Sequence, residues 1–188
     1  MELLNKAINY ATIKHDGQIR KGNKTPYILH PMEVCGIAAR IKNDENLLCA
    51  CILHDVIEDC GVSYEEIVLN FNKDIADIIM FDTEEKYRDL PSSATWDIRK
   101  QATIDLITSM NEDGKILLLA DKLSNMRSLY NDYMIQGDKV WDTFSCKDLK
   151  KQYWYYQSIA DKLKDALGYT CAFNEYQRLI QQMFNPLI

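Results

Sequence analysis

One short segment of the sequence gathers several groups that can do chemistry. Residues 53–59 contain His54, Asp55, Glu58 and Asp59 at the end of an apolar run. Because residues four apart share one face of a helix, the spacing predicts His54 over Glu58 and Asp55 over Asp59. Burying crowded carboxylates without a partner is unfavourable, and a divalent cation would resolve that conflict. The alternative is a solvated acidic turn, although an acidic helix C-terminus opposes the helix dipole.

Two further residues could complete a metal site. His30 stands just before a predicted helix, and Asp121 lies inside a largely apolar helical run. Taken alone, each is more often structural, as a satisfied histidine or a capping or pairing aspartate. Together with His54 and Asp55 they offer two imidazole nitrogens and two carboxylate oxygens, which suit one borderline first-row cation. We expect Mn²⁺, with Fe²⁺ or Zn²⁺ as alternatives, and such a cation can lower the pKa of bound water and polarise a phosphoryl oxygen.

The elements that must position these residues are predicted to be helices. Apolar residues recur at helical spacing in residues 3–11, and residues 17–26 are predicted to form a polar loop. Pro31 is predicted at the first position of a second helix. A third helix is expected from about Glu45 to Glu58, so that it carries the His54-Asp55 pair.

The rest of the chain continues the helical pattern. Ser63 and Glu66 form a capping-box pattern before the next helix. Residues 82–95 are polar and are predicted to form a loop or a mobile lid. Further helices are expected at residues 75–80, 96–110, 116–133, 147–167 and around 173–180. No run of alternating β-branched residues appears, so the expected fold class is all-α. We expect one domain over residues 1–188, with the core motifs in 1–130 and C-terminal helices 147–188 packing on it.

Composition limits the class of protein. The chain has 188 residues, 47% of them hydrophobic and 27% charged, which is ordinary for a globular domain. A net charge of −6 makes it a poor general binder of nucleic-acid polymers or anionic membranes. No apolar stretch approaches the ~20 residues that span a bilayer. The six cysteines form no CxxC pair, and with no predicted signal peptide we expect a cytoplasmic protein.

Four stretches, in this order, carry a resemblance to a known family. They are Gly17-Gln18-Ile19-Arg20-Lys21, Pro26-Tyr27-Ile28-Leu29-His30-Pro31, Leu53-His54-Asp55-Val56-Ile57-Glu58-Asp59 and Ala120-Asp121-Lys122-Leu123-Ser124-Asn125-Met126-Arg127. With them the chain resembles the HD superfamily of phosphohydrolases, and more narrowly the hydrolase domain of RelA/SpoT homologues, the small alarmone hydrolases. The resemblance implies a single-domain HD-type helical bundle. It also implies hydrolysis of guanosine 3′,5′-bis(diphosphate)-type alarmones, in which a water molecule on the metal, usually Mn²⁺, attacks and the 3′-pyrophosphate leaves.

The same resemblance implies roles for particular residues. Glu58 and Asp59 would activate the attacking water. Arg20 and Lys21 would lie beside the nucleotide, and Asn125 would hydrogen-bond it. An arginine can stack on a base or pair with phosphate, and Asn125 shares a helix face with the residue four positions before it. Without the resemblance, a solvated basic loop and a surface amide are the simpler interpretations.

Some positions depart from the family pattern. Ser124 stands where alarmone hydrolases usually carry a histidine, residues 22–25 have their own sequence, and Thr83-Glu84 replaces the usual Thr-Lys step. These departures concern the substrate more than the metal. Two alternatives therefore stay open: an HD phosphohydrolase acting on another nucleotide or a phosphorylated dinucleotide cofactor, and a module that senses metal or nucleotide without turnover. The intact Glu58-Asp59 pair argues against a pure sensor.

Overall fold

The computed structural model describes residues 2–20, 24–84, 87 and 89–185, and its regular elements are all helical. In chain order they are α1 (Glu2–Lys14), α2 (Leu29–Ala39), α3 (Glu45–Leu53), α4 (Val56–Cys60), α5 (Tyr64–Asn70), α6 (Lys73–Met80), α7 (Trp96–Leu106), the 3₁₀-helix η1 (Ile107–Ser109), α8 (Glu112–Gln136), the 3₁₀-helix η2 (Gly137–Thr143), α9 (Leu149–Leu167) and α10 (Cys171–Phe184). Within these ranges Ile19 and Pro26 form an isolated antiparallel bridge and no strand is present. The all-α prediction is confirmed. Among the described helices, none is both long and apolar enough to cross a bilayer.

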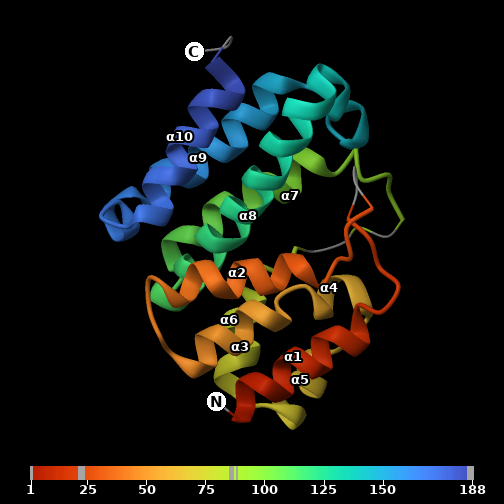
Figure 1. Cartoon of the computed structure of the whole chain (residues 1–188), viewed down its shortest axis with the longest axis vertical. Helices are drawn as coiled ribbons and strands as arrows, with labels where there is room; N and C mark the ends of the chain where they lie inside the picture. Colours follow the sequence, from red (N-terminus) through yellow and green to blue (C-terminus); the bar gives the residue numbers. More distant parts are fainter. Residues whose placement is uncertain (1, 21–23, 85–86, 88, 186–188) are drawn as a thin grey trace.

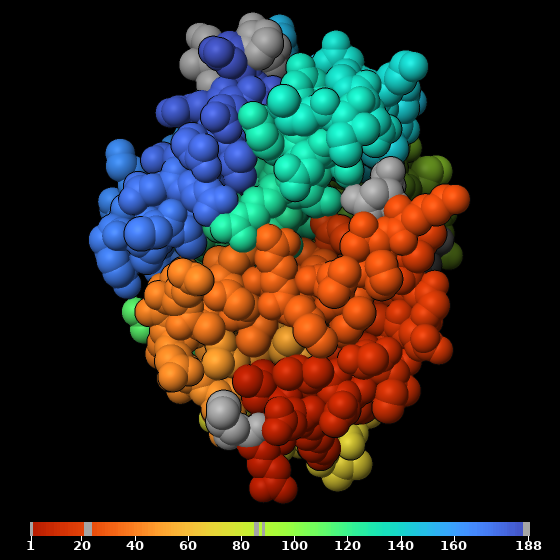
Figure 2. Space-filling model, viewed as in Figure 1, coloured from red at the N-terminus to blue at the C-terminus, as the bar shows by residue number. Residues whose placement is uncertain are grey.

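The long helix α8 connects the two ends of the molecule. Helices α2, α3 and α6 pack on it from one side, and η2, α9 and α10 pack on it from the other. In Figure 1, α1 and α3 lie at the lower end and α9 and α10 at the upper end. Figure 2 shows α2 (orange) crossing the middle of this face, between the N-terminal residues and the green-to-blue residues of α8 and α10. The buried run Ile116–Ala120 anchors α8 in the core. Residues on α2, α3 and α8 can therefore meet at one point.

Helix α2 begins two residues earlier than the proline pattern predicts. It starts at Leu29 after Ile28, so Pro31 occupies the third helical position and not the first. Proline is tolerated there because the first few N–H groups of a helix have no partner within it. The earlier start places His30 in the first turn, where its ring faces α8 and contacts Ser124.

The predicted third helix is interrupted at the His54-Asp55 pair. Helix α3 ends at Leu53 and α4 begins at Val56, with Asp55 at φ −92° and ψ −6° between them. On a regular helix, consecutive side chains point about 100° apart because there are 3.6 residues per turn. Both residues keep right-handed helical backbone angles at this break, yet their side chains bend towards each other, and Asp55 Oδ2 lies 2.9 Å from His54 Nε2. The prediction of one continuous helix was therefore wrong at the position where the chemistry lies.

Helix α5 begins as the sequence predicts, but with half of the expected capping box. The Ser63 side chain accepts a hydrogen bond from the Glu66 N–H. The Glu66 carboxylate turns to α1, where it accepts hydrogen bonds from Tyr10 and Lys14. This residue therefore ties α5 to the first helix.

Candidate metal centre

Three buried side chains, from α2, from the residue that follows α3 and from α8, form the centre of the site. His30, His54 and Asp121 are 3%, 2% and 4% exposed, and one ligand atom from each lies within 4.8 Å of the others. The Asp121 Oδ1 atom is 3.0 Å from His30 Nε2 and 3.7 Å from His54 Nε2. The structure therefore brings together three of the four metal ligands that the sequence predicts.

Asp55, the fourth predicted ligand, lies against both histidines. Its Oδ2 atom is 2.9 Å from His54 Nε2 and 3.7 Å from His30 Nε2. The same oxygen accepts a 2.6 Å hydrogen bond from the Tyr27 hydroxyl. The Tyr27 hydroxyl thus orients this carboxylate towards the two imidazoles.

The environment of His54 tests whether these residues fit a cation. Its Nδ1 atom is 2.9 Å from the carbonyl oxygen of Cys51, which can only accept, so Nδ1 carries the hydrogen. The Nε2 atom is fully buried and makes no aligned hydrogen bond, although Asp55 Oδ2 is only 2.9 Å away. Burial lowers the pKa of His54, but Asp55 and Asp121 raise it well above its ordinary value. This part of the site favours a positive charge, and the donor set fits a divalent cation.

Both oxygens of the Asp121 carboxylate contact a polar side chain, which orients the carboxylate. Its Oδ1 atom accepts a 2.6 Å hydrogen bond from Asn125, and its Oδ2 atom is 2.5 Å from Lys122 Nζ. Burial alone would raise the pKa of Asp121, but Lys122 and the histidines hold it well below its usual range. Lys122 also reaches Asp82 at 3.2 Å, and burial raises the pKa of Asp82 to about 7. No role for Lys122 or Asp82 was predicted from the sequence.

A cavity of about 1160 Å³ adjoins the cluster, which is enough for a nucleotide. Both predicted water-activating residues, Glu58 and Asp59, lie on its wall. The Glu58 Oε2 atom accepts a hydrogen bond from the backbone N–H of Glu84 at 3.2 Å. The acidic pair of α4 therefore faces the space where a substrate would sit.

Two of the predicted nucleotide contacts, Arg20 and Asn125, line the same cavity. The Arg20 guanidinium donates a 2.8 Å hydrogen bond to Asn125 Oδ1, and it lies 5.8 Å from the centre of the Tyr27 ring. Asn125 in turn contacts Asp121, so the Arg20 side chain is one residue removed from the metal cluster. Lys21, the other predicted nucleotide contact, lies outside the described residues.

Several residues on the cavity wall were not predicted. Arg99 Nη1 and Lys100 Nζ lie 2.6 Å and 2.5 Å from the Glu84 carboxylate, and both cations line the cavity. Two adjacent basic residues in a predicted helix were the available signal. Of the aromatic run at residues 153–156, Tyr155 and Tyr156 line the cavity, which the sequence could not decide.

Comparisons with known proteins agree with this geometry. The HD domain family matches residues 7–144. The guanosine-3′,5′-bis(diphosphate) 3′-pyrophosphohydrolase MESH1 of Xenopus tropicalis is 37% identical over 130 residues, which cover 68% of this chain and 69% of that protein. A GTP pyrophosphokinase of Myxococcus xanthus is 33% identical over 134 residues, but the match spans only 17% of its length.

Solved structures give the same answer about the fold. A crystal structure of lmo0812 from Listeria monocytogenes EGD-e has a TM-score of 0.72 and 31% identity, covering 83% of this chain and 99% of that one. A metazoan ortholog of SpoT, described as hydrolysing ppGpp, has a TM-score of 0.75 at 22% identity, covering 97% and 96%. On the sequence and fold together, this chain belongs to the HD domain family.

Proposed function

We propose that this chain is a metal-dependent phosphohydrolase that removes the 3′-pyrophosphate from guanosine 3′,5′-bis(diphosphate)-type alarmones. The observation that carries the proposal is the meeting of His30, His54, Asp55 and Asp121 beside a nucleotide-sized cavity. The name of the Xenopus relative, which this chain covers over two thirds of its length, supports the choice of substrate.

In this proposal the four residues hold one divalent cation. Two imidazole nitrogens and two carboxylate oxygens suit Mn²⁺, our first choice, and also Fe²⁺ or Zn²⁺. When bound, the cation would polarise a phosphoryl oxygen and lower the pKa of water. The His54 Nδ1 contact with Cys51 and the Tyr27 contact with Asp55 fix two of the ligands before the cation arrives. Less of the binding free energy is then spent on ordering side chains.

Glu58 and Asp59 would serve as the groups that orient the attacking water and take its proton. The water oxygen forms a bond to the phosphorus next to the ribose, and the bond from that phosphorus to the 3′ oxygen breaks. Pyrophosphate leaves, and the 3′ oxygen takes up a proton. A general base must lie within hydrogen-bond reach of the proton that it takes, and the hydrogen bond from the Glu84 N–H holds Glu58 on the cavity wall where this water would bind.

The substrate contacts would come from Arg20 and Asn125 on the cavity wall and from α7. Arg20 can stack on the base or pair with phosphate, and its bond to Asn125 holds it near the metal ligands. Lys21 is proposed beside it on the family resemblance alone. Arg99 and Lys100 add positive charge on the cavity wall, where the remaining phosphates would lie. An anionic substrate is thereby accommodated by a chain whose net charge is −6.

We also propose one functional domain in a cytoplasmic protein. Helices α9 and α10 pack on α8, the helix that carries Asp121, so the C-terminal part extends the same core. All six cysteines carry free thiols, which fits a reducing compartment.

One assay tests the proposed function. Mn²⁺-loaded protein is incubated with a panel of nucleotides that includes guanosine tetraphosphate and phosphorylated dinucleotide cofactors, and the released phosphate and pyrophosphate are measured separately. We expect pyrophosphate from the alarmone. Turnover of another nucleotide, with no pyrophosphate from the alarmone, would assign the site to a different substrate. Binding of nucleotides without any turnover would make the protein a sensor.

A further inference from the structure

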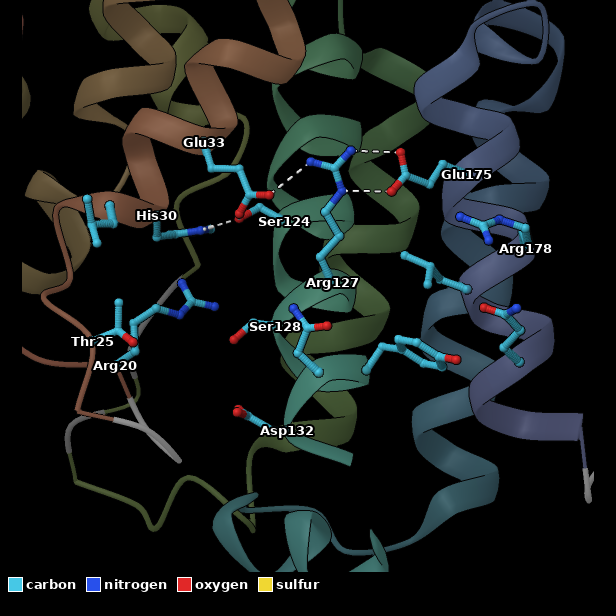
Figure 3. Close-up of a pocket in the computed structure, with 15 residues that line it drawn as sticks. Arg20, Thr25, His30, Glu33, Ser124, Arg127, Ser128, Asp132, Glu175 and Arg178 are labelled. Atoms are coloured by element: carbon cyan, nitrogen blue, oxygen red, sulfur yellow. Dashed lines mark hydrogen bonds and ion pairs between the residues drawn. The ribbon is translucent and has the colours of Figure 1, made fainter. Parts of the chain in front are cut away.

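A chain of hydrogen bonds runs from His30 away from the cation site. The His30 Nδ1 atom lies 2.9 Å from Ser124 Oγ, and Ser124 Oγ lies 2.7 Å from Glu33 Oε2. The other Glu33 oxygen accepts a 2.9 Å hydrogen bond from Arg127 Nη1. Figure 3 shows these residues side by side on α2 and α8, with Arg127 reaching across to Glu175 on α10.

The charged groups at the outer end of this chain of hydrogen bonds determine which atom donates at each step. Arg127 can only donate, so it holds Glu33 as an accepting carboxylate. Glu33 then accepts the single hydrogen of the Ser124 hydroxyl, because a carboxylate offers none. The Ser124 oxygen is left as an acceptor for His30 Nδ1–H, and His30 Nε2 therefore presents its lone pair towards Asp121 and Asp55.

Burial makes the Ser124 contact hard to replace. His30 is 3% exposed and Ser124 is 1% exposed, so solvent cannot readily take over either hydrogen bond. The outer end of this chain of hydrogen bonds is more exposed to solvent, since the side chains of Glu33 and Arg127 are 40% and 35% exposed. Arg127 is held there by two parallel hydrogen bonds to Glu175, at 2.8 Å and 2.7 Å.

We propose that Glu33, acting through Ser124, is a positioning residue that fixes the tautomer and orientation of His30 for cation binding. The proposal rests on the assignment of His30 as a metal ligand. Groups that orient a ligating histidine typically contribute 10- to 100-fold to metal affinity. Glu33 lies three residues after His30 and Ser124 three residues after Asp121, so both partners lie one turn from a ligand.

Two substitutions interrupt this chain of hydrogen bonds in different ways. Ser124→Ala removes the hydroxyl and leaves His30 Nδ1 without a partner. Glu33→Gln keeps the shape, but its amide oxygen is needed by Arg127, so its NH₂ group faces Ser124. The Ser124 hydroxyl must then donate to His30 Nδ1, which puts the imidazole hydrogen on Nε2, and this hydrogen must leave Nε2 before a cation can bind there. Ser124→Thr retains the hydroxyl and serves as the rescue variant.

Glu175→Gln is the matched control for Glu33→Gln. It alters the same Arg127 side chain from the α10 side and leaves the Glu33, Ser124 and His30 contacts in place. A merely structural role for this cluster predicts similar effects of the two glutamine variants. The proposed positioning role predicts an effect of Glu33→Gln alone.

The experiment uses the full chain after removal of bound metal and measures its Mn²⁺ dissociation constant from the electron paramagnetic resonance signal of free Mn²⁺. The midpoint of thermal unfolding of each variant checks that it folds. We expect Ser124→Ala and Glu33→Gln each to weaken binding by about 10- to 100-fold. The double variant should lose no more than the larger single loss, because both changes interrupt one chain. Ser124→Thr should bind more tightly than Ser124→Ala, and Glu175→Gln should match the parent.

Parent-like affinity of Ser124→Ala would overturn the proposal, as would multiplicative losses in the double variant or equal losses for the two glutamine variants. His54→Ala separates this failure from failure of the proposed function. If His54→Ala also binds Mn²⁺ like the parent, the metal site itself is wrong. If His54→Ala loses Mn²⁺ while Ser124→Ala keeps it, only the positioning role is wrong.

Discussion

The metal cluster and the cavity wall beside it are built in different ways. The cluster is nearly solvent-free, with His30, His54 and Asp121 at most 4% exposed. Its ligands stand at the ends or centres of helices that pack directly on one another. The wall that carries Glu58 depends on Glu84, whose backbone reaches α4 and whose side chain binds cations of α7.

This difference implies that the two regions can be changed separately. The cluster concentrates negative charge at one point, and removing a charge there acts on the cation. The wall supplies a base and substrate contacts, and changes there should act on turnover or on substrate binding while the cation stays bound. Four substitutions test this separation, from the centre of the cluster outwards, with the largest expected effect on activity first.

Asp121→Asn should have the largest effect. It removes one negative charge from the centre of the cluster and with it the ion pair to Lys122, while the Lys122 contact with Asp82 remains. We expect the Mn²⁺ affinity to fall by more than the ~100-fold typical of outer-shell residues, and pyrophosphate release to fall with it. Titration with Mn²⁺ and a turnover assay measure the two effects. Asp113→Asn is the control, because Asp113 lies on the same helix but pairs with Lys42. Parent-like Mn²⁺ binding by Asp121→Asn would contradict the assignment of Asp121 as a ligand.

Glu58→Gln should slow turnover without releasing the cation. Loss of a general base costs about 10²- to 10⁴-fold in rate, and Glu58 lies on the wall and not among the ligands. Single-turnover rates and Mn²⁺ titration on the same preparation measure both quantities. Glu65→Gln on the exposed face of α5 serves as the control. Full activity would remove Glu58 from the mechanism, and loss of Mn²⁺ would break the separation of the two regions.

Arg20→Lys should mainly weaken substrate binding. Lysine keeps the charge but loses the planar group that bonds Asn125 and lies near the Tyr27 ring. We expect KM to rise about tenfold, equivalent to about 1.4 kcal/mol, with little change in kcat. Steady-state kinetics provide the measurement, with the exposed Arg40→Lys as the control. A fall in kcat at constant KM would place Arg20 in the chemical step instead.

Glu84→Gln should affect stability more than catalysis, and in a pH-dependent way. Burial raises the pKa of Glu84, but Lys100 and Arg99 lower it below its ordinary value in the folded protein. Its ion pairs therefore stabilise the fold above the unfolded pKa of about 4.3, and this contribution is lost as the pH falls through the lower folded pKa.

Urea unfolding of the parent and of Glu84→Gln at pH 7 and at successively lower pH tests that expectation. The variant should be less stable at pH 7 by about 1.5–3 kcal/mol, the range for hydrogen bonds to charged groups. The difference should shrink in acid. A difference that stays constant or grows as the pH falls would show that the ion pairs are not its origin.

The metal cluster and the contacts around it also differ in how well they can be predicted from the sequence. His54-Asp55, His30 and Asp121 were identifiable because their residue types stand out within apolar or helix-forming segments. The break in the helix at residues 54–55 could not be identified from the sequence, since the apolar spacing continues through it. That Arg20 and Asn125 would both contact the nucleotide was expected only from the family resemblance, and their contact with each other was not predicted.

The contacts that support the site were harder to predict because they join distant segments. Ser124 and Glu33 are 91 residues apart, and Lys100 and Glu84 are 16 apart across a polar stretch. Pairing of this kind depends on how helices pack, which periodicity does not specify. The one available signal was spacing, since Glu33 and Ser124 each follow a predicted ligand by three residues.

The central claim is that one cation is held by four named side chains. Crystals of the protein grown with Mn²⁺ and measured across the manganese absorption edge would locate the ion by anomalous scattering. The account predicts one peak bonded by Nε2 of His30 and His54 and by oxygens of Asp55 and Asp121. A peak at any other group of residues, or one that His30 contacts through Nδ1, would contradict it.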